Sequence, residues 1–205
     1  MIKLIRADQY TKMLWKNGAG FTLEIARSQG EADFEWRISM ADVTTSGPFS
    51  LFPNKQRIIS VLDGQGMVLH VDDLPAKKLK QGDIFAFHGE SQVQSELVDG
   101  AIQDLNLIYD PAKFHARFQW LNEAAEQAFI SSADLIFIFN QGGETEVNVD
   151  EHSVQLAAHE TLKIEKKSGV TSMNFPKKKH KSCYIIELCT RQISQNPYPI
   201  RILPS

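Results

Sequence analysis

Residues 57–71 read Arg-Ile-Ile-Ser-Val-Leu-Asp-Gly-Gln-Gly-Met-Val-Leu-His-Val, two short apolar runs on either side of a turn. β-Branched residues recur in both runs, as is typical of strands. Asp63, Gly64 and Gly66 are residues that turns prefer, because they adopt backbone angles that other residues avoid. The stretch therefore predicts a β-hairpin with strands over 57–62 and 67–71.

Similar short runs recur along most of the chain. They are rich in Ile, Val and Phe, and most are closed by Gly, Pro, Asn or Asp. Further strands are predicted at 35–43, 84–87, 102–109, 114–120, 135–139, 145–149, 161–165 and 184–188. Helix is expected only at 8–12 and 123–127. Many short strands at near-regular spacing indicate an all-β fold, a sandwich or a barrel.

The chain also shows a weak internal duplication. A second glycine turn, over 139–143, resembles the turn over 62–66, and two short strands are predicted after each. The segments 79–85 and 156–162 follow these turns at comparable offsets. We therefore expect two β-rich halves, 1–110 and 111–205, packed as one body.

Composition limits the classes of partner. The chain has 205 residues, of which 42% are hydrophobic and 23% are charged, as in ordinary globular proteins. Its 22 basic and 25 acidic residues give a net charge of -3, so no overall field attracts nucleic acid or anionic membrane. The basic run over 177–181 is interpreted as a solvated turn. We expect a small-molecule or protein partner.

The cysteines and the N-terminus indicate a cytoplasmic protein. The first basic residues are followed by Asp8 and Gln9 rather than by the apolar core of a signal peptide. No segment approaches the ~20 apolar residues that span a bilayer. Cys183 and Cys189 would share one face of a predicted strand, too far apart to form a disulfide, so two buried free thiols are expected.

The hairpin glycines, with Gly82 and Gly89, resemble the framework of the cupin barrel. This resemblance implies double-stranded β-helix (cupin) barrels, here a bicupin with little helix. Cupin motifs normally deliver metal ligands to the barrel mouth, but Gln92 stands where the last histidine ligand would be. Arg57 stands where the glutamate ligand would be, which favours an anion over a cation. The alternative is that Arg57 is a surface arginine at the start of a strand.

No metal ion or other cofactor is expected. Catalytic metal sites need three ligands that converge on one point, and the six histidines occur singly, without a His-x-His motif. They are His70, His88, His115, His152, His159 and His180.

The segments 15–25 (WKNGAGFTLEI), 34–41 (FEWRISMA) and 47–53 (GPFSLFP), followed by Arg57 and by Asp104-Leu105-Asn106, closely resemble the HutD/Ves family in order and spacing. The resemblance implies an association with bacterial histidine utilisation. It further implies that the protein binds a pathway metabolite such as formylglutamate or urocanate and moderates expression of the pathway. A homodimer is compatible with the resemblance to cupins.

Alternating side chains define the candidate site. Arg37 and Ser39 share one face of their predicted strand, and Asp104 and Asn106 share one face of theirs. Such polar faces point either to solvent or into a pocket, and the family resemblance favours a pocket. The candidate ligand-binding residues are Trp15, Asn17, Gly18, Glu24, Arg37, Ser39, Arg57, Gln92, Asp104 and Asn106.

These residues suit a small acid. Arg37 or Arg57 would hold a carboxylate bidentately, while Asn17, Asp104 and Asn106 would bind amide or amino groups. The turn at Asn17-Gly18 would offer free backbone N–H groups. A second interpretation is that Glu24, Arg37, Arg57 and Asp104 form a buried ion-pair network that fixes strand register.

Three functions stay open at this point. The first is a small-acid-binding regulatory protein without catalytic residues. The second is a metal-independent cupin enzyme, an isomerase or hydrolase of a small acid, with Glu24, Asp104 or His88 as proton carrier. The third is an interaction module whose exposed sheet recruits a protein.

Overall fold

The fold is all-β, as the sequence predicts, and was obtained as a computed structural model that describes residues 1–15, 20–30, 33–122, 126–176 and 182–191. A single-turn 3-10 helix, η1, covers Ala7–Gln9. The early strands are β1 (Ile2–Ile5), β2 (Thr11–Leu14), β3 (Gly20–Arg27), β4 (Trp36–Val43), β5 (Gly47–Pro48), β6 (Gln56–Asp63), β7 (Met67–Val71), β8 (Lys77–Leu79), β9 (Ile84–His88), β10 (Val93–Leu97) and β11 (Ile102–Tyr109). The later strands are β12 (Phe114–Leu121), β13 (Gln127–Ser131), β14 (Leu135–Asn140), β15 (Thr145–Val149), β16 (His152–Leu156), β17 (Thr161–Glu165), β18 (Thr171–Phe175) and β19 (Cys183–Thr190).

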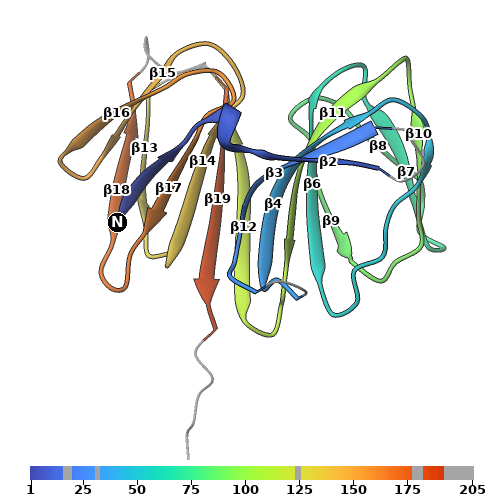
Figure 1. Cartoon of the computed structure of the whole chain (residues 1–205), viewed down its shortest axis with the longest axis horizontal. Coiled ribbons are helices and arrows are strands. Elements are labelled where there is room, and N and C mark those ends of the chain that lie inside the picture. Colours follow the sequence, from blue (N-terminus) through green and yellow to red (C-terminus); the bar gives the residue numbers. More distant parts are fainter. Residues whose placement is uncertain (16–19, 31–32, 123–125, 177–181, 192–205) are drawn as a thin grey trace, which may run out of the picture.

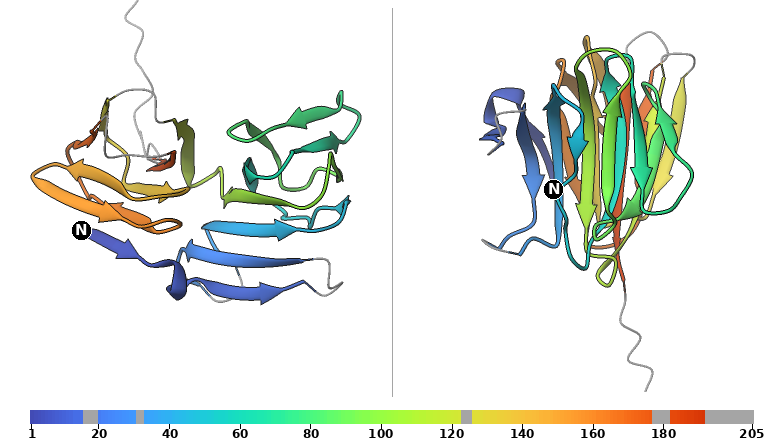
Figure 2. Two further views of the ribbon diagram at one scale, coloured as in Figure 1. Left: turned by 90° about the horizontal axis from the view of Figure 1, so that it is seen from above. Right: turned by 90° about the vertical axis from the view of Figure 1, so that its right-hand side faces the viewer.

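Four sheets build two bodies that lie side by side (Figures 1 and 2). The first body contains a six-stranded sheet, β2-β3-β4-β11-β6-β9, and a four-stranded sheet, β5-β10-β7-β8. The second contains a five-stranded sheet, β1-β17-β14-β19-β12, and a four-stranded sheet, β13-β18-β15-β16. All pairs of named strands are antiparallel, which suits strands joined by short turns.

Strand β1 does not pair within the first body. It pairs with β17 of the second, with Ile2 opposite Ile164 and Ile5 opposite Thr161, and the chain then crosses to β2 (Figure 1). The division into two halves at residue 110 therefore stays a prediction. β1 precedes that point in the sequence but pairs with a strand of the second body.

The structure bears out only part of the predicted helix, as a single 3-10 turn near residue 8. Only Ala7–Gln9 is helical in the first segment, and Thr11 already begins β2. In the second segment, residues 123–125 lie outside the described part and Gln127 begins β13. Both segments are too short for a helix to gain much from burying one apolar face, so pairing with a neighbouring strand prevails.

The two bodies share one apolar core. The face of the six-stranded sheet that carries Trp36, Ile38 and Leu107 packs against Phe137 and Tyr184 of the second body. The rings of Trp36 and Phe137 lie 5.1 Å apart, between centroids. This burial removes one whole face of the central strands from water, which is the main stabilising term for such sheets.

The opposite face of the same sheet lines the interior of the first body. At one end it is apolar, where Ile59 and Val61 pack against Met67, Leu69 and Leu79. Because β6 is covered on both faces, it reads as a nearly continuous apolar run rather than an alternating one.

The junction between the bodies is also closely fitted. β6 and β11 shift register between Gln103 and Asp104, and this bulge leaves the carbonyl of Leu62 free of the ladder. The side-chain amides of Gln81 and Gln141 both donate to that carbonyl, one from each body.

The two cysteines do not form a disulfide. Cys183 is buried, Cys189 is partly buried, and both are free.

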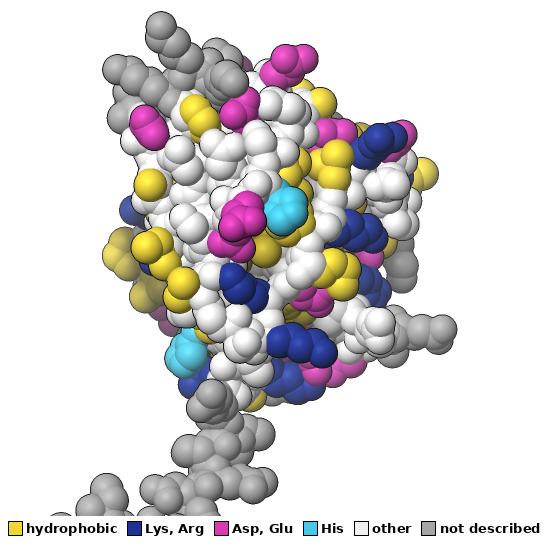
Figure 3. Space-filling view, turned by 90° about the vertical axis from the view of Figure 1, so that its left-hand side faces the viewer, with side chains coloured by type: hydrophobic (Ala, Val, Ile, Leu, Met, Phe, Trp, Pro, Cys, Tyr) yellow, Lys and Arg dark blue, Asp and Glu magenta, His cyan; other side chains and the backbone are white. Residues whose placement is uncertain are grey.

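The surface carries charges of both signs. Figure 3 shows acidic and basic side chains on the same face of the molecule. In the described part of the chain, no helix is both long and apolar enough to cross a bilayer.

Tyr184 supplies a polar contact across the junction that mutation can test. Its hydroxyl accepts from Ser60 Oγ at 3.1 Å and donates to the carbonyl of Val61 at 3.3 Å. We expect Tyr184→Phe to lower the free energy of unfolding by about 1–2 kcal/mol, because buried partners lose their hydrogen bonds. Urea denaturation checks this. Tyr109→Phe is the control, since no hydroxyl hydrogen bond of Tyr109 is found among the described residues, and an equal loss there would contradict the assignment.

Candidate functional site

A pocket of about 670 Å³ opens between the two sheets of the first body. Side chains from β3, β4, β6, β10 and β11 form its wall, together with the segment that follows β5. The six-stranded sheet supplies the polar side chains of this pocket. They alternate along β4, β6 and β11 with residues of the shared core and therefore point to the opposite face of the sheet; they are Arg37, Arg57, Asp104 and Asn106.

Arg57 lies deep in the pocket wall. It is only 6% exposed, and its guanidinium lies 4.9 Å from the ring of Phe49, 5.4 Å from that of Phe52 and 5.0 Å from that of Phe87. Nη1 donates to the carbonyl of Ser50 at 3.1 Å, whereas Nε has no partner among the described residues. A buried cation with an unused donor is well suited to an anion that approaches through the pocket.

Arg37 supplies a second cation to the same pocket. Its guanidinium lies 4.9 Å from the ring of Phe34 and 5.1 Å from that of Phe52. Phe52 therefore contacts both arginines, Arg37 and Arg57. The Nε atom of Arg37 also lacks a hydrogen-bond partner in the described part of the structure.

Two acceptors lie in the same wall on β11. Asp104 is 2% exposed and Asn106 is 7% exposed, and the Oδ1 atom of each has no described hydrogen-bond partner. Buried polar atoms without partners are rare and costly, because the folded state loses the hydrogen bond that water supplied. Four of the buried polar atoms without a described partner therefore lie around one cavity.

Burial shifts the pKa values of these groups. It raises the pKa of Asp104 to about 7, with the charge of Arg57 opposing the rise and that of Asp42 adding to it. Burial lowers the pKa of Arg57 to about 10, with Asp104 opposing, so the guanidinium stays charged at neutral pH. The pKa of Arg37 is also lowered by burial, while Glu24 counteracts this.

The structure brings together six of the ten sequence-predicted residues. The pocket is lined by Trp15, Arg37, Ser39, Arg57, Asp104 and Asn106. Trp15 is held in place by a hydrogen bond from Nε1 to Thr22 Oγ1 of 2.9 Å.

The other four predicted residues lie elsewhere. Glu24 is on β3, outside the pocket lining but close enough to act on the pKa of Arg37. Gln92 is exposed between β9 and β10, also outside the lining. Asn17 and Gly18 lie outside the described residues.

The structure does not support the ion-pair network proposed for these charges. None of the ion pairs found among the described residues contains Glu24, Arg37, Arg57 or Asp104. His88, a candidate proton carrier, is exposed and lies outside the pocket lining, with Nδ1 2.5 Å from Gln56 Nε2.

Sequence reasoning did not assign the aromatic wall to the site. Phe49 and Phe52 belong to the quoted segment 47–53, so their motif was visible, but phenylalanines there also suit an ordinary core. Ser95 was not anticipated either. It lines the pocket from β10, and its Oγ donates to the carbonyl of Gly47 at 2.9 Å.

The second body contains a buried carboxylate whose charge is paired by neighbouring side chains. A smaller pocket of about 230 Å³ is lined by Arg117, Ser131 and Glu187. There, Arg117 and Ser131 both donate to the buried carboxylate of Glu187, so its charge is paired within the protein. Unpartnered charges are therefore not a general property of this fold.

A metal centre finds no support in the described side chains. They contain no group of three or more His, Cys, Asp or Glu residues placed to hold a metal ion.

Known relatives cover most of the chain. A family model described as HutD matches residues 7–184. An uncharacterized 21.2 kDa protein in the hutC 3' region of Pseudomonas putida is 46% identical over 167 residues, 80% of this chain and 87% of that protein. Protein Ves of Escherichia fergusonii is 30% identical over 161 residues, 76% of this chain and 84% of that protein.

Solved structures agree with these matches. HutD from Pseudomonas fluorescens has a TM-score of 0.82 and 39% identity, over 94% of this chain and 100% of that one. Two more distant structures show the fold alone. The protein YlbA of Escherichia coli has a TM-score of 0.68 and 10% identity, over 94% of this chain and 93% of that one. A salicylate 1,2-dioxygenase from Pseudoaminobacter salicylatoxidans has a TM-score of 0.59 and 8% identity, over 95% of this chain and 86% of that one. They confirm the predicted cupin-type barrels.

Asp104 makes stability depend on pH in a predictable direction. Its pKa is raised in the folded protein, so folding favours the protonated form, and this contribution is lost as pH rises from about 4 to about 7. We expect Asp104→Asn to exceed the wild type in unfolding free energy at pH 8, on the order of 3 kcal/mol, and to match it near pH 4.

Urea denaturation at the two pH values measures this difference. Asp63→Asn, at an exposed aspartate that ends β6, is the matched control. A constant difference between wild type and Asp104→Asn across this pH range would contradict the burial of an unpaired carboxyl group.

Proposed function

Because the chain belongs to the HutD family, we propose that it binds a small carboxylate metabolite in the pocket of the first body and thereby modulates histidine utilisation, without catalysis. One observation carries the proposal. In the described part of the chain, two arginines whose Nε atoms have no hydrogen-bond partner line the same cavity as two buried acceptors without one, Asp104 and Asn106.

The arginines favour a carboxylate as the anchoring group. A planar guanidinium binds a carboxylate with two parallel hydrogen bonds, and burial strengthens this contact because little water competes. Arg57 is fixed by the carbonyl of Ser50 and by three aromatic rings, so little side-chain entropy is lost when the acid binds.

The acceptors favour a hydrogen-bond donor elsewhere on the ligand. Asp104 Oδ1 and Asn106 Oδ1 would accept from an amide or ring N–H group. A small acid that carries such a group completes both sides of the pocket, as formylglutamate and urocanate do.

The relatives support the link to histidine utilisation. The Pseudomonas putida relative is named for its place in the hutC 3' region, and the family carries the same prefix. A pocket lined by two arginines is suited to sensing an acidic metabolite of that pathway.

Thermal denaturation with added acid tests the binding. At 100 times the dissociation constant, formylglutamate or urocanate should raise the melting temperature by roughly 5–10 °C through mass action. Arg57→Met should abolish this shift, because it removes the anchoring cation and keeps most of the side-chain volume.

Lys55→Met is the matched control for that variant. Lys55 is also a buried cation, 8% exposed, but it pairs with Asp33 outside the pocket lining, so the acid-induced shift should persist. If neither acid nor a related small carboxylate shifts the wild-type melting temperature, the proposal is wrong.

A metal-independent enzyme is the second candidate, and the pKa of Asp104 favours it. A carboxyl group with a pKa of about 7 in a pocket is suited to proton transfer near neutral pH. Of the three carriers considered from the sequence, Asp104 alone lines the pocket.

Turnover would decide for the enzyme. Chelator-treated protein is incubated with formylglutamate or urocanate, and the mixture is followed by proton NMR. Under the binding proposal both acids stay unchanged. Product formation that is retained after chelation and lost in Asp104→Asn would establish the enzyme instead.

A further inference from the structure

Among the described residues, Asp104 is the one acidic side chain in the pocket lining, and charged groups lie on both neighbouring strands. Arg57 on β6 and Asp42 on β4 both act on its pKa, and Arg37 lies further along β4. Glu24 acts from β3 on Arg37. The pocket therefore has a cationic side and, at Asp104, a site whose charge depends on one proton.

We infer that Asp104 sets the charge of the acid that this pocket accepts. A ligand with one carboxylate and a neutral amide at that position binds the pocket whether or not Asp104 is ionised, whereas a ligand with a second carboxylate there binds only as Asp104 takes up a proton. The inference rests on the proposed function, since it assumes that a small acid occupies this pocket.

The contacts of Asp104 carry the first step. The side chain is 2% exposed, and no described donor reaches Oδ1. No ion pair between Arg57 and Asp104 is found among the described residues; Nη1 of Arg57 donates to the carbonyl of Ser50, and its Nε has no described partner. Oδ1 of Asp104 is therefore available for a hydrogen bond with a ligand.

Neighbouring acids add to this effect. Asp42, next to Ala41 on β4, pairs its Oδ1 with the amide of Gln103 at 2.9 Å and keeps a negative charge near Asp104. A second ligand carboxylate beside Asp104 would add a further negative charge to the pocket, on top of the influence of Asp42.

A ligand carboxylate in contact with the carboxylate of Asp104 is repelled unless the two groups share a proton. Two carboxyl groups in one low-dielectric site cannot both ionise, so one of them becomes a neutral acid. The neutral acid then donates its O–H to the other carboxylate, which turns repulsion into a hydrogen bond. A neutral amide at the same place binds with either protonation state, because its N–H donates to ionised Asp104 and its C=O accepts from the protonated form.

The raised pKa of Asp104, about 7 without ligand, places this exchange near neutral pH. At pH 6 most molecules already hold the proton, and at pH 8 few do. Binding of a dicarboxylate then has to supply the proton from solution and weakens as pH rises, whereas binding of a monocarboxylate amide does not.

Two matched acids test the inference. N-formylglutamate has two carboxylates, and N-formylglutamine replaces one of them by an amide of the same size. Neither acid titrates between pH 6 and pH 8. Isothermal titration calorimetry at both pH values should show the dissociation constant of N-formylglutamate rising about tenfold from pH 6 to pH 8, because each pH unit above the pKa lowers the protonated fraction tenfold. That of N-formylglutamine should change less than about twofold, since its amide needs no proton.

The variant Asp104→Asn keeps the shape of the side chain and removes its titration. It should bind N-formylglutamate with the same affinity at both pH values, close to that of the wild type at pH 6. Asp42→Asn, outside the pocket lining, should retain a pH dependence. In the wild type at pH 8, titrations in two buffers of different ionisation enthalpy should show uptake of about one proton per dicarboxylate bound, because ionised Asp104 must be protonated.

The outcomes separate this inference from the proposed function. If neither acid binds at either pH, both fall. If both acids bind with the same affinity ratio at pH 6 and pH 8, a small-acid site stands and the role of Asp104 is wrong. The wild-type ratio alone is sufficient for that decision, even if Asp104→Asn does not fold.

Discussion

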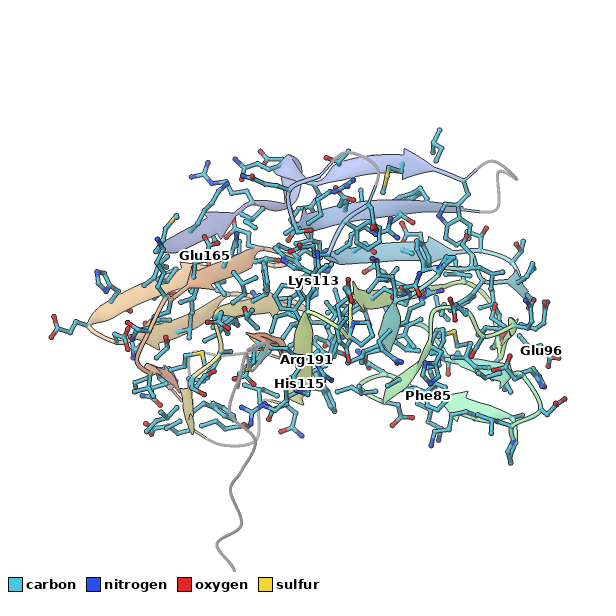
Figure 4. The ribbon with its side chains drawn as sticks, turned by 90° about the horizontal axis from the view of Figure 1, so that it is seen from below. Phe85, Glu96, Lys113, His115, Glu165 and Arg191 are labelled. Carbon is cyan, nitrogen blue, oxygen red and sulfur yellow. The ribbon has the colours of Figure 1, made fainter. Side chains whose placement is uncertain are left out.

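The packing of the six-stranded sheet against the second body determines which side chains can reach the pocket. One face of β4, β6 and β11 is committed to the shared core through residues such as Trp36, Ile38 and Leu107. Because side chains alternate along a strand, this burial turns Arg37, Arg57 and Asp104 toward the interior of the first body. A shift of one residue in register would exchange the two sets and place charges in the aromatic core. The site is therefore held by the same apolar contacts that hold the fold. Figure 4 labels Lys113, in the segment that joins β11 to β12, and Arg191, whose backbone N–H donates to the carbonyl of Lys113.

The arrangement has an energetic cost that the rest of the protein offsets. Arg57 and Asp104 are both buried, yet Nε of the one and Oδ1 of the other have no hydrogen-bond partner among the described residues. In the second body, Glu187 shows that the same chain can pair a buried carboxylate fully, with Arg117 and Ser131. Leaving such groups incomplete lowers stability and is typical of positions kept for a ligand. The aromatic rings around Arg57 moderate the cost, because a guanidinium retains favourable contacts with π faces where water is absent.

Much of the fold and part of the site could be predicted from the sequence. Strands such as β7, β11, β15 and β17 have the predicted bounds, since apolar runs closed by turn residues leave little choice. Alternation identified Arg37 with Ser39 and Asp104 with Asn106, because polar residues within buried strands have to face something polar. Gln92 was chosen by counting along a cupin motif, and such counting does not show where a loop directs a side chain. The role of Phe49 and Phe52 could not be predicted, because a phenylalanine that packs on a guanidinium cannot be distinguished in the sequence from one that packs in an apolar core.

The crossing of β1 has a consequence for how the chain acquires its structure. Ile2 and Ile164 are partners in the ladder, so β1 pairs with a strand that follows it much later in the sequence. Until β17 exists, the backbone groups of β1 on that side have no strand to pair with, and the loop to be closed spans most of the chain. Closing a loop of that length costs entropy before any contact repays it, which slows folding. During synthesis, β1 therefore cannot take its place in this ladder before β17 has been made, so the second body is completed only by contacts between distant parts of the sequence.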